Sequence, residues 1–207
     1  MGSHRRGITA DELQRDMEAR YRNDPAYRAQ VDRVETEHQA RSEELRRAER
    51  PLIEELRSAG VLVSSVWQLY AHPDKGEVAF PILRRHLLLD YPDRILEGIA
   101  RGFTRQAVRQ NWAQLLEIYL RESRPPVRDG LAATLSMHAV RAHYEDLIGI
   151  LENEALGETR IYFLRPVNLI GNRMEPGRGR QVVAQVAADP QLVREATAIL
   201  QGRDRNR

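Results

Sequence analysis

The feature that most constrains this chain is a sequence repeat with a period close to 32 residues. The segment ILEGIARGF, residues 95–103, aligns with VRDGLAATL, residues 127–135, at an offset of 32. Two weaker copies follow, at residues 161–169 and 193–200. The first apolar residue of each copy serves as an anchor, with spacings of 32, 34 and 32 residues: Ile95, Val127, Ile161 and Val193. A period of this length is typical of proteins built from stacked helix pairs.

A second apolar block repeats at the same offset, so each unit is expected to contain two helices. Trp112 falls on Tyr144, and the two stretches around them match in their apolar positions. Because one helix pair cannot cover its own apolar face, successive pairs stack and share a core. Gly98 and Gly130 also align. Glycine within a helix costs roughly 1 kcal/mol relative to alanine, so the aligned glycines predict close packing there.

The segment PPVRDGLAATL, residues 125–135, resembles the first helix of HEAT-type repeats, in which a proline-led turn precedes Val-Arg and several small residues. Residues 187–200, AADPQLVREATAIL, have the same character. The resemblance is to small bacterial HEAT-repeat proteins. It implies an all-α, right-handed α-solenoid of helix pairs and names no function. As departures from the pattern, we expect Pro166 to interrupt a first helix and residues 174–179 to shorten the second helix that follows.

The N-terminal segment differs from the repeats, and we divide the chain into a charged helical arm (1–48), a repeat domain (49–202) and a polar tail (203–207). Asp24 followed by Pro25 predicts the start of an extended helix, with Asp24 as its N-cap. A stripe with heptad-like spacing follows: Val31, Val34, His38, Arg41, Leu45, Ala48 and Leu52. Its polar middle favours a solvated helix pinned at its C-terminal end, with dimerisation through the arm as an alternative.

Composition excludes several classes of function. The chain has no cysteine, which excludes disulfides, thiol catalysis and cysteine-ligated metal sites and favours a cytoplasmic protein. No apolar stretch reaches the 18 residues or so that a membrane-spanning helix needs. Lys and Arg number 32 against 30 Asp and Glu, for a net charge of +2. This near balance disfavours nucleic acid as the partner.

No grouping of residues predicts catalysis, a bound metal or a cofactor. The chain lacks the His-Glu dipeptides of HEAT-like di-iron hydroxylases, and residues 177–180 (GRGR) are interpreted as a flexible linker rather than a phosphate loop. The alternative enzyme class is the HEAT-like alkylpurine DNA glycosylases, for which Trp112, Tyr144 and Asp146 would line the groove. Aromatic residues at equivalent repeat positions are more typical of core, so we expect Trp112 and Tyr144 to be buried.

A row of hydrogen-bond donors remains as the candidate binding surface. Arg109 and Arg141 are 32 residues apart and thus on equivalent turns of successive second helices. The full set of candidate partner-binding residues is Arg84, Arg85, Arg109, Asn111, Arg141, His143, Arg178 and Arg180. Such a row suits the carboxylates of a protein with an acidic surface. We therefore expect a non-catalytic binding module, either an adaptor or an inhibitor- or immunity-like protein. The other hypotheses are a solvated face whose arginines pair with nearby acids, and a self-associating structural protein.

Overall fold

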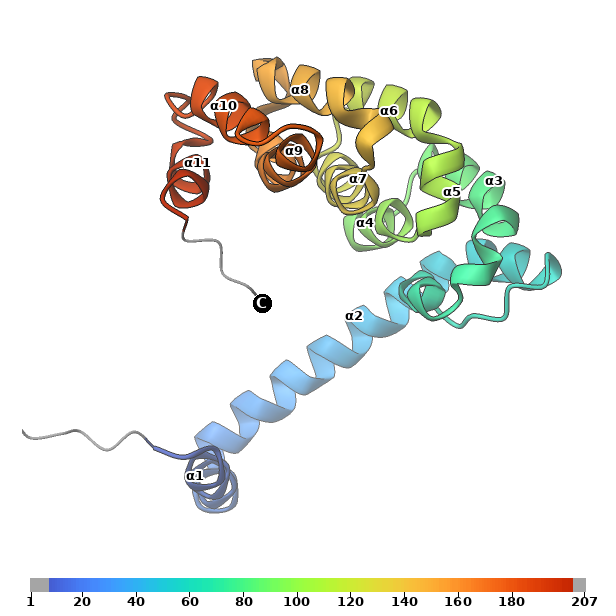
Figure 1. Cartoon of the computed structure of the whole chain (residues 1–207). Helices are drawn as coiled ribbons and strands as arrows, with labels where there is room; N and C mark the ends of the chain where they lie inside the picture. Colours follow the sequence, from blue (N-terminus) through green and yellow to red (C-terminus); the bar gives the residue numbers. More distant parts are fainter. Residues whose placement is uncertain (1–7, 203–207) are drawn as a thin grey trace, which may run out of the picture. The chain divides into compact units, whose positions relative to one another are not determined.

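A computed structural model describes residues 8–202, and within that range the chain forms eleven α-helices and no β-strand (Figure 1). The prediction of an all-α protein is confirmed. The chain divides into two compact units, Met1–Arg47 and Ala48–Arg207, with the boundary inside the long helix α2 (Pro25–Ser58). The polar tail predicted at residues 203–207 lies outside the described residues.

The first unit contains two helices, α1 (Ala10–Asn23) and the N-terminal part of α2. Thr9 and Glu12 form a capping box at the start of α1, in which the Glu12 N–H donates to Thr9 Oγ1 at 3.3 Å and the Thr9 N–H donates to Glu12 Oε2 at 2.9 Å. Asp24 begins α2 as predicted, since its Oδ1 accepts from the N–H groups of Ala26 and Tyr27 at 3.0 and 3.1 Å. Local capping therefore determines the single-residue corner between the two helices.

The C-terminal turns of α2 belong to the second unit and are buried there. Leu52, Ile53 and Leu56 lie in the core, so the expectation of a helix pinned at its C-terminal end is confirmed. Glu49, also buried, accepts hydrogen bonds from the Val66 N–H at 2.5 Å and the Ser65 hydroxyl at 3.1 Å. These contacts attach the end of α2 to the turn that follows it.

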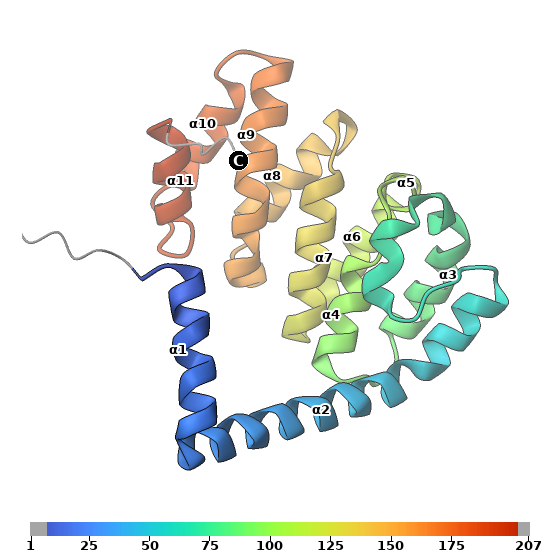
Figure 2. The ribbon, with the colours of Figure 1, turned by 90° about the horizontal axis from the view of Figure 1, so that it is seen from below.

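The rest of the second unit is a series of short helices: α3 (Gly76–Leu87), α4 (Asp93–Arg101), α5 (Arg105–Gln110), α6 (Trp112–Arg121), α7 (Pro125–His138), α8 (Tyr144–Glu152), α9 (Ile161–Met174), α10 (Arg178–Gln185) and α11 (Val193–Leu200). Short 3-10 helices connect them at Val66–Ala71, Pro73–Lys75, Arg141–His143 and Glu154–Arg160. In Figures 1 and 2, α4, α7, α9 and α11 lie side by side in chain order, each packed on the next. The alternate helices flank this row: α3 packs on α4, α6 on α7, α8 on α9, and α10 on α9 and α11.

The two aligned glycines lie where neighbouring elements approach closely. A Cβ atom on Gly130 would be 2.6 Å from Cβ of Ala100, at the contact between α7 and α4. A Cβ on Gly98 would be 2.6 Å from Cγ1 of Val66. Both distances are too short for a larger residue, so the predicted packing role of these glycines is confirmed.

The predicted anchors are wrong in the last two repeats. Ile161 and Val193 are exposed, because each is the first residue of its helix and extends past the packed face. The neighbouring residues Phe163 and Leu192 are buried in their place. Only the copies anchored at Ile95 and Val127 keep the register that the alignment assigned, since both of those residues are buried.

The expectation that Pro166 interrupts a helix is also wrong. Helix α9 continues through this proline to Met174. A proline in a helix interior removes one backbone hydrogen bond and costs about 3 kcal/mol. Phe163, Leu164 and Val167 on either side of it are fully buried, and their packing offsets that cost. The following helix, α10, has only 8 residues, in agreement with the predicted shortening.

Candidate functional site

Three of the predicted arginines gather around the segment that leads into α8. Arg109 is exposed on α5, and Arg141 is exposed in the turn Arg141–His143. Arg178, in the first turn of α10, has its Cζ 5.0 Å from the centre of the Tyr144 ring. Burial lowers the pKa of His143, and the charge of Arg109 lowers it further against an opposing effect of Asp146. Arg109 and Arg178 therefore approach the same short segment from α5 and α10.

Two further groups belong to this cluster and were not predicted. Arg105 precedes Arg109 by one helical turn and is likewise exposed. Burial lowers the pKa of His138, at the end of α7, and the charges of Arg105 and Arg109 lower it further. The spacing of four residues between Arg105 and Arg109 is the sequence signal that could have identified Arg105. We name the resulting set the basic edge: Arg105, Arg109, His138, Arg141 and Arg178.

Most of the positive charge on the basic edge is not neutralised by the chain itself. Within the described residues, Arg105, Arg109 and Arg141 form no ion pair. Arg178 differs, because its Nη2 donates to Glu145 at 2.9 Å. The alternative hypothesis of a solvated face requires these arginines to pair with nearby acids. Such a pair is present at one position of the basic edge, Arg178. Three exposed guanidinium groups remain able to bind carboxylates from outside the chain.

The arginines of α3 do not belong to the basic edge. Glu77, in the first turn of α3, accepts from Gln106 and Gln110 of α5, which shows that α5 faces that end of α3. Arg84 lies two turns further along α3, where it is exposed. Arg85 beside it forms an ion pair with Glu55.

Three other predicted residues have local structural roles. Asn111 donates to the carbonyl of Ala107 at 2.9 Å, at the end of α5. Arg180 donates to the carbonyl of Leu200 at 2.7 Å, and with Arg178 it belongs to the first turn of α10 rather than to a flexible linker. His143 is only 9% exposed, because its imidazole stacks on the Trp112 indole. This stack removes His143 from the expected row of surface donors.

The aromatic residues that a glycosylase-like site would need are part of the core. Trp112 and Tyr144 are both buried, as the core interpretation predicted. The Trp112 Nε1–H donates to Asp146 Oδ2 at 2.7 Å, so this carboxylate is used to hold the indole. A shallow pocket of about 310 Å³ lies beside them and is lined by Trp112, Ala113, Leu116, Glu117, Leu120, Arg121 and Asp146.

The described residues contain neither a candidate metal site nor a candidate membrane-spanning helix. Between residues 8 and 202, no three His, Asp or Glu side chains are grouped so that they could hold a metal ion. No helix in the described part of the chain combines the length and the apolar character needed to cross a membrane. Comparisons with protein-family models, curated proteins and solved structures give no match.

Proposed function

We propose that this chain is a non-catalytic protein-binding module, an adaptor or an inhibitor- or immunity-like protein, that uses the basic edge to bind an acidic protein surface. The observation that carries the proposal is the set of three exposed arginines without an ion pair, Arg105, Arg109 and Arg141. Each of these arginines has buried residues close to it in the chain: Ala107 and Val108 on α5, and His143 two residues after Arg141. The core therefore fixes the backbone from which these side chains extend before any partner arrives, which reduces the entropic cost of binding.

The architecture that we propose for this role is a right-handed α-solenoid of HEAT-type helix pairs. Two observations support it: the 32-residue offset between the copies at Ile95 and Val127, and the successive packing of α4, α7, α9 and α11. Proteins of that type carry binding residues on equivalent positions of successive repeats. Arg109 and Arg141 are 32 residues apart, although neither lies on a second helix as expected: Arg109 is on α5, before α6, and Arg141 is in the 3-10 turn before α8.

A protein partner is favoured over nucleic acid by the charge of the chain. The net charge is +2, and the acidic residues Glu145 and Asp146 lie four and five residues after Arg141. Phosphate backbones are bound by larger basic surfaces and with strong salt dependence. A small set of guanidinium groups next to carboxylates instead matches a protein surface on which both signs of charge alternate. Arginine also binds carboxylates in a planar, bidentate geometry, which gives direction to the contact.

The proposal is tested with the double variant R109E/R141E and a matched control, R194E. Arg194 lies on α11, and like the two test residues it is exposed and forms no ion pair within the described residues. Proteins retained from extracts of the source cell by the wild type are compared with those retained by each variant. We expect one partner to be kept by the wild type and by R194E and lost by R109E/R141E, with unchanged helical content in circular dichroism.

The purified partner then gives the quantitative measurement. Its affinity for R109E/R141E should fall at least about 100-fold, since two attractive contacts become repulsive. Equal affinity for the wild type and the double variant would refute the basic edge as the binding surface. Salt-labile binding to damaged duplex DNA, with release of a base, would instead support the glycosylase-like alternative.

A further inference from the structure

The described part of the first unit, residues 8–47, has an exposed apolar groove and no buried residue. No residue of α1 is buried, and the buried residues of α2 all come after Arg47. Leu13 and Met17 are 52% and 50% exposed, and Tyr21, Val31 and Val34 are exposed as well. Two amphipathic helices of this kind gain their stability by burying the apolar face against another element.

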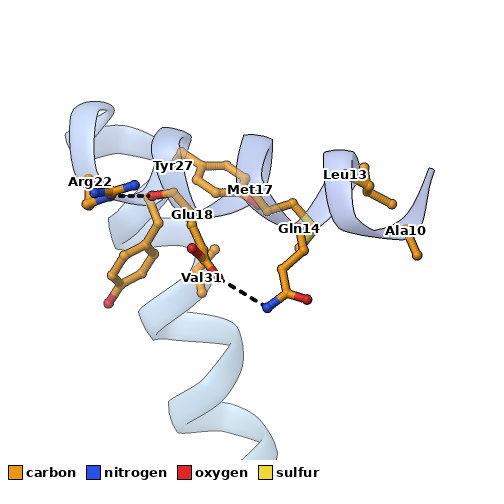
Figure 3. A pocket seen from close by; sticks show the side chains of 9 residues that line it. Ala10, Leu13, Gln14, Met17, Glu18, Arg22, Tyr27 and Val31 are labelled. Atoms are coloured by element: carbon orange, nitrogen blue, oxygen red, sulfur yellow. Dashed lines mark hydrogen bonds between the residues drawn. The ribbon is translucent and has the colours of Figure 1, made fainter. Parts of the chain in front are cut away.

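The groove lies between α1 and the first turns of α2 (Figure 3). Its apolar lining comes from residues that recur four apart on each helix: Leu13, Met17 and Tyr21 on α1, and Tyr27 and Val31 on α2. The volume enclosed is about 700 Å³. The spacing of four residues places each set on one helix face, which is the sequence signal for this surface. The heptad-like stripe includes Val31 and Val34, whereas the apolar face of α1 lies outside that stripe.

Several contacts hold the corner between the two helices in shape. The Tyr21 hydroxyl donates to Asp32 Oδ1 at 2.6 Å. Arg28 Nε donates to the Tyr21 carbonyl at 2.9 Å, and Arg28 Nη2 donates to the Arg22 carbonyl at 2.6 Å. The Arg20 guanidinium lies 4.6 Å from the centre of the Tyr27 ring. These interactions preform the groove and leave its apolar floor open.

The charges around the groove indicate what covers it. Residues 10–47 carry ten acidic and eight basic side chains, a composition that does not suit an anionic lipid surface or a nucleic acid. Within α1 the charges at the two ends differ in sign: Asp11 and Glu12 lie in the first turn, and Arg20 and Arg22 lie in the last turn. The middle of the helix carries both signs, with Arg15, Asp16 and Glu18. A second α1 in the antiparallel direction would place the acidic start of each helix beside the basic end of the other. The two ends of the helix are therefore complementary in charge to those of a second copy.

We propose that the groove is a dimerisation surface, on which two copies of this chain pair through α1 and the first turns of α2. The two-fold axis passes near Met17, so that the two Met17 side chains meet and Leu13 of each copy packs on Tyr21 of the other. This arrangement is a four-helix assembly with an isologous interface, as in two-fold dimers, the commonest symmetric oligomers. It is independent of the basic edge, which belongs to the second unit.

The stripe along α2 predicts where the contact ends. After Val34 the heptad-like positions are His38 and Arg41, which are exposed and polar. Burying a charged side chain without a partner is costly, so the two chains separate beyond Val34. The dimer contact is thus confined to α1 and the first three turns of α2.

The test measures the solution mass of the full chain by sedimentation across a dilution series. We expect the wild type to have twice the monomer mass and the double variant L13D/M17E to be a monomer, with dimer dissociation constants that differ at least about 100-fold. The control is M137E, because Met137 is an apolar residue of the second unit with a higher exposed fraction, 68%. This variant should remain a dimer. A wild type that is monomeric throughout, as when α1 packs on another part of its own chain, would overturn the proposal, and so would a dimer that survives L13D/M17E.

A second variant tests the geometry with a smaller change in apolar packing than L13D/M17E. The chain contains no cysteine, so M17C introduces a single reporter thiol. With the axis near residue 17, mild oxidation should convert M17C to a disulfide-linked dimer, while M137C should stay unlinked at the same chain concentration. Equal slow cross-linking of both variants would exclude the antiparallel arrangement. Selective capture of a foreign amphipathic helix by a monomeric wild type would instead assign the groove to another protein.

Discussion

The indole of Trp112 lies flat on the imidazole of His143, with ring centroids 3.7 Å apart and an angle of 10° between the ring planes. Both rings have polar contacts: the Trp112 Nε1–H donates to Asp146, and the Val140 N–H lies 3.3 Å from Nδ1 of His143. The pair joins the start of α6 to the turn before α8. Because Nδ1 accepts a hydrogen bond only when it carries no proton, this junction favours the neutral imidazole.

The first prediction follows from the charge state of this histidine. Burial lowers the pKa of His143, so between the folded pKa and about 6.5 the unfolded chain binds a proton that the folded chain does not. The free energy of unfolding should therefore fall as the pH is lowered from about 7.5 to about 5.5, and His86 and His138, whose pKa values burial also lowers, add to the effect. Urea unfolding at a series of pH values measures the slope.

The variant H143N isolates the contribution of His143. Asparagine keeps an acceptor near the position of Nδ1 and does not titrate in this range, so the slope should decrease. The two proteins share all other ionisable groups. Identical slopes for the wild type and H143N would show that His143 gains its proton as readily in the folded chain as in the unfolded one.

A second prediction concerns two helical glycines in different surroundings. G130A should destabilise the fold by about 1–3 kcal/mol, because the new methyl group would overlap Ala100 at the contact of α7 with α4. G149A is the matched control: Gly149 is exposed on α8, and an added Cβ would meet no atom within 4 Å. It should stabilise by up to about 1 kcal/mol, since alanine is the better helix former. Thermal and urea unfolding of both variants would show effects of opposite sign.

A third prediction concerns the buried carboxyl of Glu49. Burial raises its pKa, against the opposing effect of the hydrogen bonds from Val66 and Ser65. A raised carboxyl pKa stabilises the fold fully below the unfolded value, near 4.5, and this contribution is lost as the pH rises through the folded value. E49Q keeps the acceptor for the Val66 N–H without the charge, so its stability at pH 7.5 should equal or exceed that of the wild type. The advantage should shrink towards pH 4.5.

The companion variant E49A separates the hydrogen bond from the charge. It leaves the buried Val66 N–H without an acceptor, which costs about 1–3 kcal/mol. Unfolding at pH 7.5 should rank the proteins with E49Q at or above the wild type and E49A below both. An E49Q variant as unstable as E49A would mean that the negative charge itself is needed.

A fourth prediction concerns Arg160, which is buried before α9. Its guanidinium donates to the carbonyls of Leu151 and Gly157, each at 3.0 Å, and pairs with Asp189 at 2.7 Å. R160A leaves the acid and two carbonyls without their partner and should cost about 3–5 kcal/mol. R121A, which removes an exposed pair with Glu117, should change stability by less than about 1 kcal/mol. A small effect of R160A in urea unfolding would contradict this assignment.

Local and periodic signals in the sequence determined much of this protein. Asp24 and Pro25 define the corner before α2 by capping, which needs no distant contact. The Thr9 and Glu12 capping box marks α1 in the same way. The offset between the copies at Ile95 and Val127 predicted buried aromatic positions and close glycine contacts, because repeated packing leaves a repeated pattern.

The tertiary structure alone decided which side chains remain exposed and able to bind a partner. Pro166 stays inside α9 because burial of its neighbours outweighs the free-energy cost of a proline within a helix. Sequence rules expect that cost to end the helix. His143 has the sequence context of a surface donor, yet the approach of Trp112 from a different helix buries it. The basic edge likewise depends on α5 and α10 both approaching the segment that leads into α8. Long-range packing sets this arrangement, and the spacing of residues along the chain does not predict it.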